Sequence, residues 1–145
     1  DEEEICKWAK EDKKSDLVII THYPTKKRPM YTFPDPKDPD YTYSFDILGM
    51  GVEWVTGGQR INDYQQLYES IKSRGYNPDN FSFYLQAFKY GMPPEGGFCL
   101  GLERITQHLL GLENVRQASL FPRDLSRVDV KLAEIKKNNV SSKKK

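Results

Sequence analysis

Residues 97–123 read GFCLGLERITQHLLGLENVRQASLFPR, and this stretch decides the fold. Its glycine-spaced apolar start predicts a strand, and Leu102-Glu103-Arg104 marks the beginning of a helix. An arginine fixed where a strand becomes a helix can press its flat guanidinium against a base or clamp a phosphate. The alternative is a core strand joined to an amphipathic helix, with Arg104 on the surface. Four apolar residues are expected to pack inward: Leu102, Ile105, Leu109 and Leu110.

The composition is that of one soluble globular domain. The 145 residues are 37% hydrophobic and 30% charged, which is enough apolar material for a core. The formal net charge of +1 excludes a global basic field, so any affinity for nucleic acid must come from local patches. No run approaches the length of a membrane span, and we expect no membrane partner.

The two cysteines indicate a reducing environment. Cys6 and Cys99 lie far apart and form no metal-ligand spacing, which predicts free thiols and a cytoplasmic location. The chain starts at Asp1 without a methionine, a hint that it is cut from something longer.

The order of short strands and helices predicts an α+β fold. Helices are expected over residues 1–14, over residues 63–75 with Asp63 as the cap, and over residues 77–88 with Asn77 as the cap. A buried strand is expected at residues 17–20, and further strands at residues 30–33, 43–48 and 52–56. Residues 34–40 (PDPKDPD) form a loop. Residues 131–145 form a basic, flexible tail.

One candidate polar site is the run EWVTGGQR at residues 53–60, with Asp46 upstream. Glu53 and Thr56 can supply oxygen ligands to a hard cation such as Mg²⁺. In an ideal strand these two side chains face opposite ways, so the glycine pair that follows must bend the chain. Arg60 lies beyond the bend, and its planar fork suits bidentate capture of a carboxylate. The alternative is a charged edge strand followed by a surface hairpin.

The second candidate site lies in the opening stretch. Gly97 and Gly101 let a backbone come close to a ligand, and Arg104 is the natural contact. His22 and His108 have the pattern of structural histidines. The basic run Lys26-Lys27-Arg28 is interpreted as a solvated turn, although it has the charge to meet a phosphate backbone.

Four stretches, in order, carry a family resemblance. They are THYPTKKRPMYTFPDP, YSFDILGMGVEWVTGGQRINDY, FKYGMPPEGGFCLGLER and GLENVRQASLFPRD. Together they resemble the aspartyl-tRNA synthetases of the archaeal/eukaryotic type, which are class II aminoacyl-tRNA synthetases, over roughly residues 15–130. The resemblance implies that residues 1–130 are the C-terminal part of a catalytic domain built on an antiparallel sheet flanked by helices.

The resemblance also implies a role for each matching position. Arg104 and Glu53 would be the catalytic residues. The ATP site would be formed by Glu53, Gly101, Leu102, Glu103 and Arg104. Thr56 and Arg60 would bind aspartate. Glu53, Thr56 and Asp46 would surround Mg²⁺. The implied cofactors are ATP and Mg²⁺, and the implied partners are aspartate and tRNA specific for aspartate, with asparagine tRNA as a second candidate.

Three positions depart from the usual pattern. Cys99 stands where glycine is usual, which leaves the pocket less room. Asn62 replaces a usual histidine. Glu95 replaces another histidine and adds negative charge near the expected ATP entrance.

The family's motifs 1 and 2 and its anticodon-binding barrel are not seen in this sequence. We therefore expect the activity to belong to a full-length, homodimeric parent, and the isolated chain to activate aspartate poorly or not at all. Three alternatives remain open: an asparaginyl-tRNA synthetase, an ATP-dependent asparagine synthetase-like paralogue, and a decayed interaction module without enzymatic activity.

Overall fold

A computed structural model of the chain describes residues 1–123. The chain divides into two compact units, with the boundary between Gly101 and Leu102, and each is described by itself. The tail expected at residues 131–145 lies outside the described residues.

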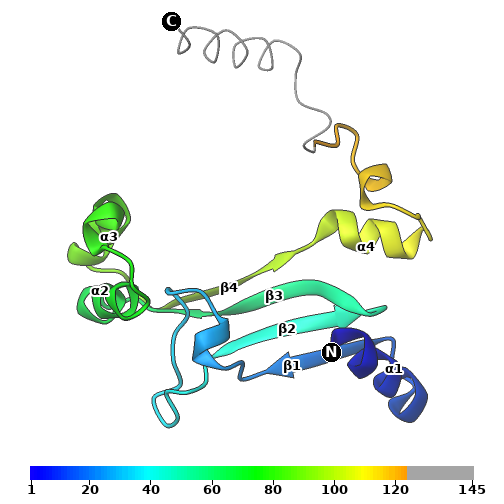
Figure 1. Ribbon diagram of the computed structural model, residues 1–145, viewed down its shortest axis with the longest axis horizontal. Helices are drawn as coiled ribbons and strands as arrows, with labels where there is room; N and C mark the ends of the chain where they lie inside the picture. The colour runs from blue at the N-terminus through cyan, green and yellow to red at the C-terminus, as the bar shows by residue number, and fades with distance from the viewer. Residues whose placement is uncertain (124–145) are drawn as a thin grey trace, which may run out of the picture. The chain divides into compact units, whose positions relative to one another are not determined.

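An antiparallel sheet organises the first unit. Its strands are β1 (Leu17–Thr21), β2 (Ser44–Gly49), β3 (Val52–Arg60) and β4 (Glu95–Leu100). The strands lie side by side in chain order, and every neighbouring pair is antiparallel (Figure 1). With helices at both ends of this sheet, the expected α+β fold with an antiparallel sheet is confirmed.

The N-terminal helix α1 (Glu2–Lys13) packs beside the first three strands. Its start is fixed by a capping box, in which Asp1 accepts from the backbone N–H of Glu4 and the Glu4 side chain returns to Asp1. Acids in the first turn and lysines in the last turn match the helix dipole, as the sequence predicts. Lys14 ends the helix in the left-handed conformation.

The main apolar core lies at the other end of the sheet, where α2 (Tyr64–Ser73) and α3 (Ser82–Lys89) pack together (Figure 1). Asp63 caps α2 by accepting from the Gln66 N–H at 2.7 Å, as expected. The helix predicted from Asn77 is divided into the short 3-10 helix η2 (Pro78–Phe81) and α3. The core consists of Ile61, Leu67, Ile71, Leu85 and Phe88.

The strand expected at residues 30–33 does not form. Only isolated bridges occur here, from Thr32 to Arg60 and from Pro34 to Thr42. Prolines at positions 29 and 34 lack the N–H groups that a ladder needs, so the segment cannot pair along its length. Met30, Tyr31 and Phe33 pack instead against the core between α2 and α3.

The prediction of a buried strand at residues 17–20 is correct for the strand and wrong for the burial. Strand β1 alternates between exposed and half-buried residues, and Leu17 and Ile19 are 46% and 62% exposed. Because β1 lies at the edge of the sheet and α1 covers only part of it, one face of the strand remains open.

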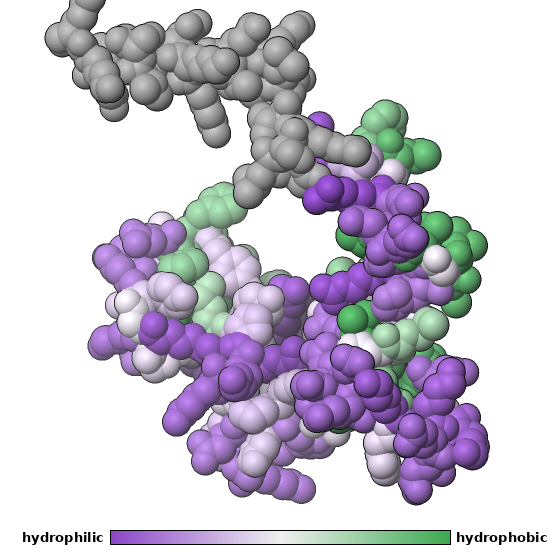
Figure 2. All heavy atoms as spheres, turned by 45° about the vertical axis from the view of Figure 1, so that its right-hand side comes forward, coloured by the Kyte–Doolittle hydropathy of each residue, from purple (hydrophilic) through white to green (hydrophobic). Residues whose placement is uncertain are grey.

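The second unit contains α4 (Leu102–Leu109) and the 3-10 helix η3 (Val115–Ala118), which contact each other. The leucines expected to pack inward are exposed: Leu102, Leu109 and Leu110 are 69%, 70% and 68% accessible. Figure 2 likewise shows apolar groups at the surface among mostly hydrophilic ones.

Candidate active site

A pocket of about 340 Å³ opens on the sheet of the first unit. Strands β2, β3 and β4 contribute to its wall, together with the loop before β2. Its lining includes Arg28, Tyr31, Ser44, Thr56, Arg60 and Cys99. Both expected aspartate-binding residues, Thr56 and Arg60, therefore line one cavity.

Strand register places the expected polar residues on one face of the sheet. Asp46 pairs with Thr56, and Leu48 pairs with Glu53, so each pair shares a face. Between these pairs the register shifts, because β3 carries one extra residue, Trp54. That bulge reverses the alternation, and Glu53 and Thr56 consequently face the same way.

The prediction that the glycine pair bends the chain is therefore wrong. Strand β3 and its pairing with β4 continue without interruption through Gly57 and Gly58 to Arg60, and the surface hairpin considered as the alternative is absent from this segment. The bulge at Trp54, rather than the glycine pair, brings Glu53 and Thr56 to the same face of the sheet. A bulge leaves no composition signal as plain as a glycine pair, which is why the sequence pointed to the glycines.

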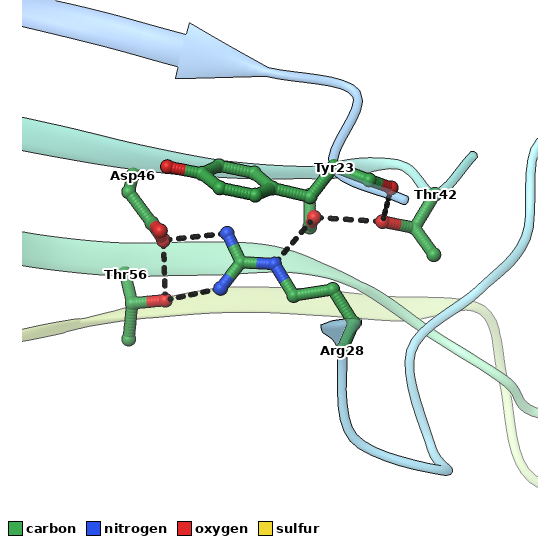
Figure 3. A network of polar contacts seen from close by, with 6 residues as sticks. Tyr23, Arg28, Thr42, Asp46 and Thr56 are labelled. Carbon is green, nitrogen blue, oxygen red and sulfur yellow. Dashed lines mark hydrogen bonds and ion pairs between the residues drawn. The ribbon is translucent and has the colours of Figure 1, made fainter. Parts of the chain in front are cut away.

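Arg28 is the functional candidate that the sequence interpretation missed. It was expected in a solvated turn, yet its side chain is only 12% exposed. Its Nη2 lies 2.7 Å from Asp46 Oδ1, and its Nε donates to Ser44 Oγ at 3.0 Å (Figure 3). The available signal was a single arginine after two lysines, because arginine is the cation that best tolerates burial beside a carboxylate.

The carboxylate of Asp46 is the centre of this network. It is buried, and its Oδ1 accepts from Thr56 Oγ1 at 2.6 Å in addition to the Arg28 contact. The ring of Tyr23 covers the guanidinium, with the Arg28 Cζ atom 3.8 Å from the ring centroid. Each charge in the network is thus balanced where solvent is scarce.

The hydroxyl of Tyr23 responds to this environment. Burial, followed by the hydrogen bond to Asp46 and its negative charge, raises the pKa of Tyr23 to about 12. A raised pKa means that the folded chain favours the neutral phenol. The resulting stabilisation is complete below pH 10, the ordinary pKa of the group, and disappears as the pH rises from 10 to about 12.

We expect this phenol to be visible by ultraviolet titration. Subtracting the tyrosinate absorbance of Tyr23→Phe from that of the unmodified chain isolates one group, with an expected midpoint of about 12. Asp46→Asn removes two causes of the shift, so the midpoint should move back toward 10 in that background. A difference midpoint at 10 in the unmodified chain would show that the hydroxyl is neither buried nor in contact with Asp46.

Arg60 is held at the rim of the pocket. It ends β3, and its guanidinium carbon lies 4.7 Å from the centroid of the Tyr31 ring. The side chain is exposed in this chain, which leaves its N–H groups accessible to a ligand. Stacking on Tyr31 limits the rotamers of the arginine before any ligand arrives.

The three unusual positions lie near the same sheet. Cys99 lines the pocket. Glu95 pairs with Arg60 across β3 and β4, at the end of the strand pair. Asn62 donates from its side chain to the carbonyl of Met92 at 3.1 Å, so it ties two connecting segments together.

The structure gathers part of the expected site. Thr56 and Arg60 line one pocket, and Asp46 meets it through its hydrogen bond with Thr56. Neither Asp46 nor Glu53, which shares the face of Thr56, is among the lining residues. Gly101 ends the first unit, and its N–H donates to the Trp54 carbonyl at 2.8 Å. Leu102, Glu103 and Arg104 start α4 in the second unit.

The chemistry of the donor set suits Mg²⁺. A carboxylate and a hydroxyl on one face are oxygen ligands, and Mg²⁺ bound with nucleotide phosphates needs only one or two carboxylates from the protein. Over residues 1–123 there is no group of three or more His, Cys, Asp or Glu side chains that could hold a metal by itself. No helix in this part of the chain is long and apolar enough to cross a membrane.

Comparison with known proteins defines the class. The family model described as tRNA synthetases class II (D, K and N) matches residues 1–125. The chain belongs to this family. Its similarity to the Thermus thermophilus aspartate–tRNA(Asp/Asn) ligase is 52% identity over 121 residues, which is 83% of this chain and 28% of that ligase.

Solved structures agree with this assignment. The aspartyl-tRNA synthetase of Entamoeba histolytica superposes with a TM-score of 0.81 at 37% identity, over 88% of this chain and 26% of that one. The asparaginyl-tRNA synthetase of the same organism, in complex with asparaginyl-adenylate, gives a TM-score of 0.72 at 39% identity, over 81% and 27%. The chain spans between a quarter and a third of the length of these relatives.

Proposed function

We propose that this chain is the C-terminal part of the catalytic domain of an aspartate–tRNA ligase, with residues 1–130 as that part. Such an enzyme joins aspartate to ATP as aspartyl-adenylate and then transfers the aspartyl group to tRNA. The observation that carries the proposal is the shared pocket of Thr56 and Arg60, combined with 52% identity to the Thermus ligase.

Arg60 and Thr56 would bind aspartate. The exposed guanidinium at the rim has the shape and charge to receive the side-chain carboxylate in a bidentate pair. Thr56 lines the same pocket, and its hydroxyl is hydrogen-bonded to Asp46 and Arg28. Neither residue is a nucleophile, in keeping with a reaction in which the α-carboxylate of the substrate itself attacks the α-phosphorus of ATP.

The nucleotide end of the site would involve Arg104, which would contact the adenine or the γ-phosphate. Gly101, Leu102 and Glu103 would line the same ATP site. Glu53 and Thr56 would hold Mg²⁺, and Asp46 would belong to that environment through its hydrogen bond with Thr56. Bound Mg²⁺ would neutralise phosphate charge. The protein contributes positioning and electrostatic stabilisation through Glu53, Arg60 and Arg104.

The remaining partners follow from the same proposal. The acceptor would be tRNA specific for aspartate, and the complete enzyme would be a homodimer that serves translation in the cytoplasm. The isolated chain would be inactive, because the residues that grip the α-phosphate would come from the rest of the enzyme.

Asparagine is the second candidate substrate. It is favoured by one observation, the 39% identity and TM-score of 0.72 to a synthetase bound to asparaginyl-adenylate. Arg60 argues for aspartate, since a guanidinium satisfies a carboxylate better than a neutral amide.

A chimeric enzyme tests the function. This chain would replace the matching C-terminal segment of the Thermus thermophilus ligase, whose 52% identity favours a correct fit. We expect ATP–pyrophosphate exchange that depends on aspartate, with asparagine at least about tenfold less effective. Exchange with asparagine alone would reassign the substrate. A folded chimera without ATP binding would favour a decayed module, and free asparagine formed from aspartate and ammonia would favour the synthetase-like paralogue.

A further inference from the structure

We propose that Arg28 is a positioning residue of the amino-acid subsite. Its guanidinium fixes the Thr56 hydroxyl so that Thr56 meets a ligand only through an oxygen lone pair, toward a hydrogen-bond donor or a cation. This inference rests on the proposed function for its substrate, and on the buried network of Figure 3 for its geometry.

The guanidinium of Arg28 meets three oxygen atoms from two strands. Nε donates to Ser44 Oγ at 3.0 Å, and Nη1 donates to Thr56 Oγ1 at 3.4 Å. Nη2 lies 2.7 Å from the Asp46 carboxylate, in a charge contact whose N–H is not aligned for a hydrogen bond. The exposed fractions of the Arg28 and Asp46 side chains are 12% and 5%, so the contacts are largely shielded from solvent.

A second arginine fixes the backbone that carries Arg28. Arg74, at the C-terminal end of α2, donates from Nη1 to the Arg28 carbonyl at 2.6 Å. Its Nη2 donates to the Thr25 carbonyl at 3.0 Å. The loop is thereby attached to the main core, and the Arg28 side chain enters the pocket from a fixed point.

The hydrogen-bonding capacity of Thr56 then determines what it can bind. A hydroxyl has one proton and two lone pairs. The proton is donated to Asp46 Oδ1, and one lone pair receives Nη1 of Arg28. One lone pair remains for the pocket, so the group that meets Thr56 must be a donor or a cation, such as the ammonium of an amino acid. The side-chain carboxylate of the substrate is directed elsewhere, toward Arg60.

The test is a double-substitution cycle in the chimeric enzyme. Arg28→Met, Thr56→Val and the double variant would be compared by the KM for aspartate and the KM for ATP. We expect each single change to lower kcat/KM for aspartate by roughly a hundredfold, and the KM for ATP to change less in Arg28→Met than in Thr56→Val. The double variant should be no worse than Thr56→Val alone, because Arg28 acts through Thr56.

The matched control is Lys27→Met, which removes a neighbouring positive charge and should change neither constant. Arg28→Lys keeps the charge but loses the fork, so it should fail to restore the KM for aspartate. If Arg28→Met does not fold because it leaves Asp46 buried without a counter-charge, Arg28→Met/Asp46→Asn replaces it, and the KM for aspartate should still rise. The proposal would be overturned if the effects of the two single substitutions multiply in the double variant. It would also be overturned if Arg28→Lys has the same KM for aspartate as the unmodified enzyme.

A substrate-free measurement separates this inference from the proposed function. In the 145-residue chain, the methyl carbon resonance of Thr56 should shift in Arg28→Met and stay in place in Lys27→Met. An unmodified chimera without exchange activity would count against the proposed function only. An unmoved Thr56 resonance would count against the positioning role, whatever the activity.

Discussion

Replacing Arg60 by alanine should nearly abolish aspartate activation at ordinary substrate concentrations. In the chimeric enzyme we expect kcat/KM for aspartate to fall between roughly 30-fold and several thousandfold. Removing one partner of a buried, hydrogen-bonded charge pair costs about 2–5 kcal/mol, and each 1.4 kcal/mol is a factor of ten. The measurement is pyrophosphate exchange at varied aspartate and at varied ATP.

Comparing the KM for aspartate with the KM for ATP distinguishes a loss of aspartate binding from damage to the fold. Arg60 stacks on Tyr31, and loss of an exposed cation–π contact costs only about 0.5–1 kcal/mol of stability. The KM for ATP should therefore stay the same, and Arg60→Lys should fall between the unmodified enzyme and alanine. Near-normal aspartate activation by Arg60→Ala would remove this residue from the site.

The second large effect is expected from a single methyl group at Gly58. A Cβ built there lies 2.7 Å from the Tyr43 carbonyl oxygen and 3.0 Å from the Ser44 Cα. That carbonyl accepts the N–H of Gln59 at 2.8 Å, so it cannot move without loosening the β2–β3 contact. Gly58→Ala should lower the free energy of unfolding by about 1–3 kcal/mol, measured by urea unfolding of the chain.

Gly97 is the matched control for this substitution. It pairs with Gly58 across β3 and β4 and lines the same pocket, yet a Cβ built there meets nothing within 4 Å. Gly97→Ala should change the free energy of unfolding by no more than about 0.5 kcal/mol. Equal losses from the two substitutions would mean that the strands are not packed as described at Gly58.

Local signals in the sequence predicted the helices and most of the sheet correctly. Asp63 and Asn77 each cap the element that follows, because their side chains bond backbone N–H groups within the next few residues. The failures involve partners distant in the chain. Residues 30–33 have strand composition, but flanking prolines and the distant helices α2 and α3 decide where that segment packs.

The candidate site shows the same division. Thr56 and Arg60 were identified because four stretches resemble a family, and the structure places both in one pocket. Arg28 was missed because its burial depends on Asp46, 18 positions later, and on Arg74 in α2. Pairing between distant residues leaves no periodicity in the sequence, so only the folded chain reveals it.

The central claim is that Arg60 binds the side-chain carboxylate of the amino-acid substrate. A crystal structure of the chimeric enzyme with ATP and an alcohol analogue of aspartate, which lacks the reactive α-carboxylate, tests it most directly. We predict the side-chain carboxylate of the analogue against the Arg60 guanidinium, in the pocket that Thr56 also lines. Density that places this carboxylate away from the Arg60 guanidinium would contradict the account.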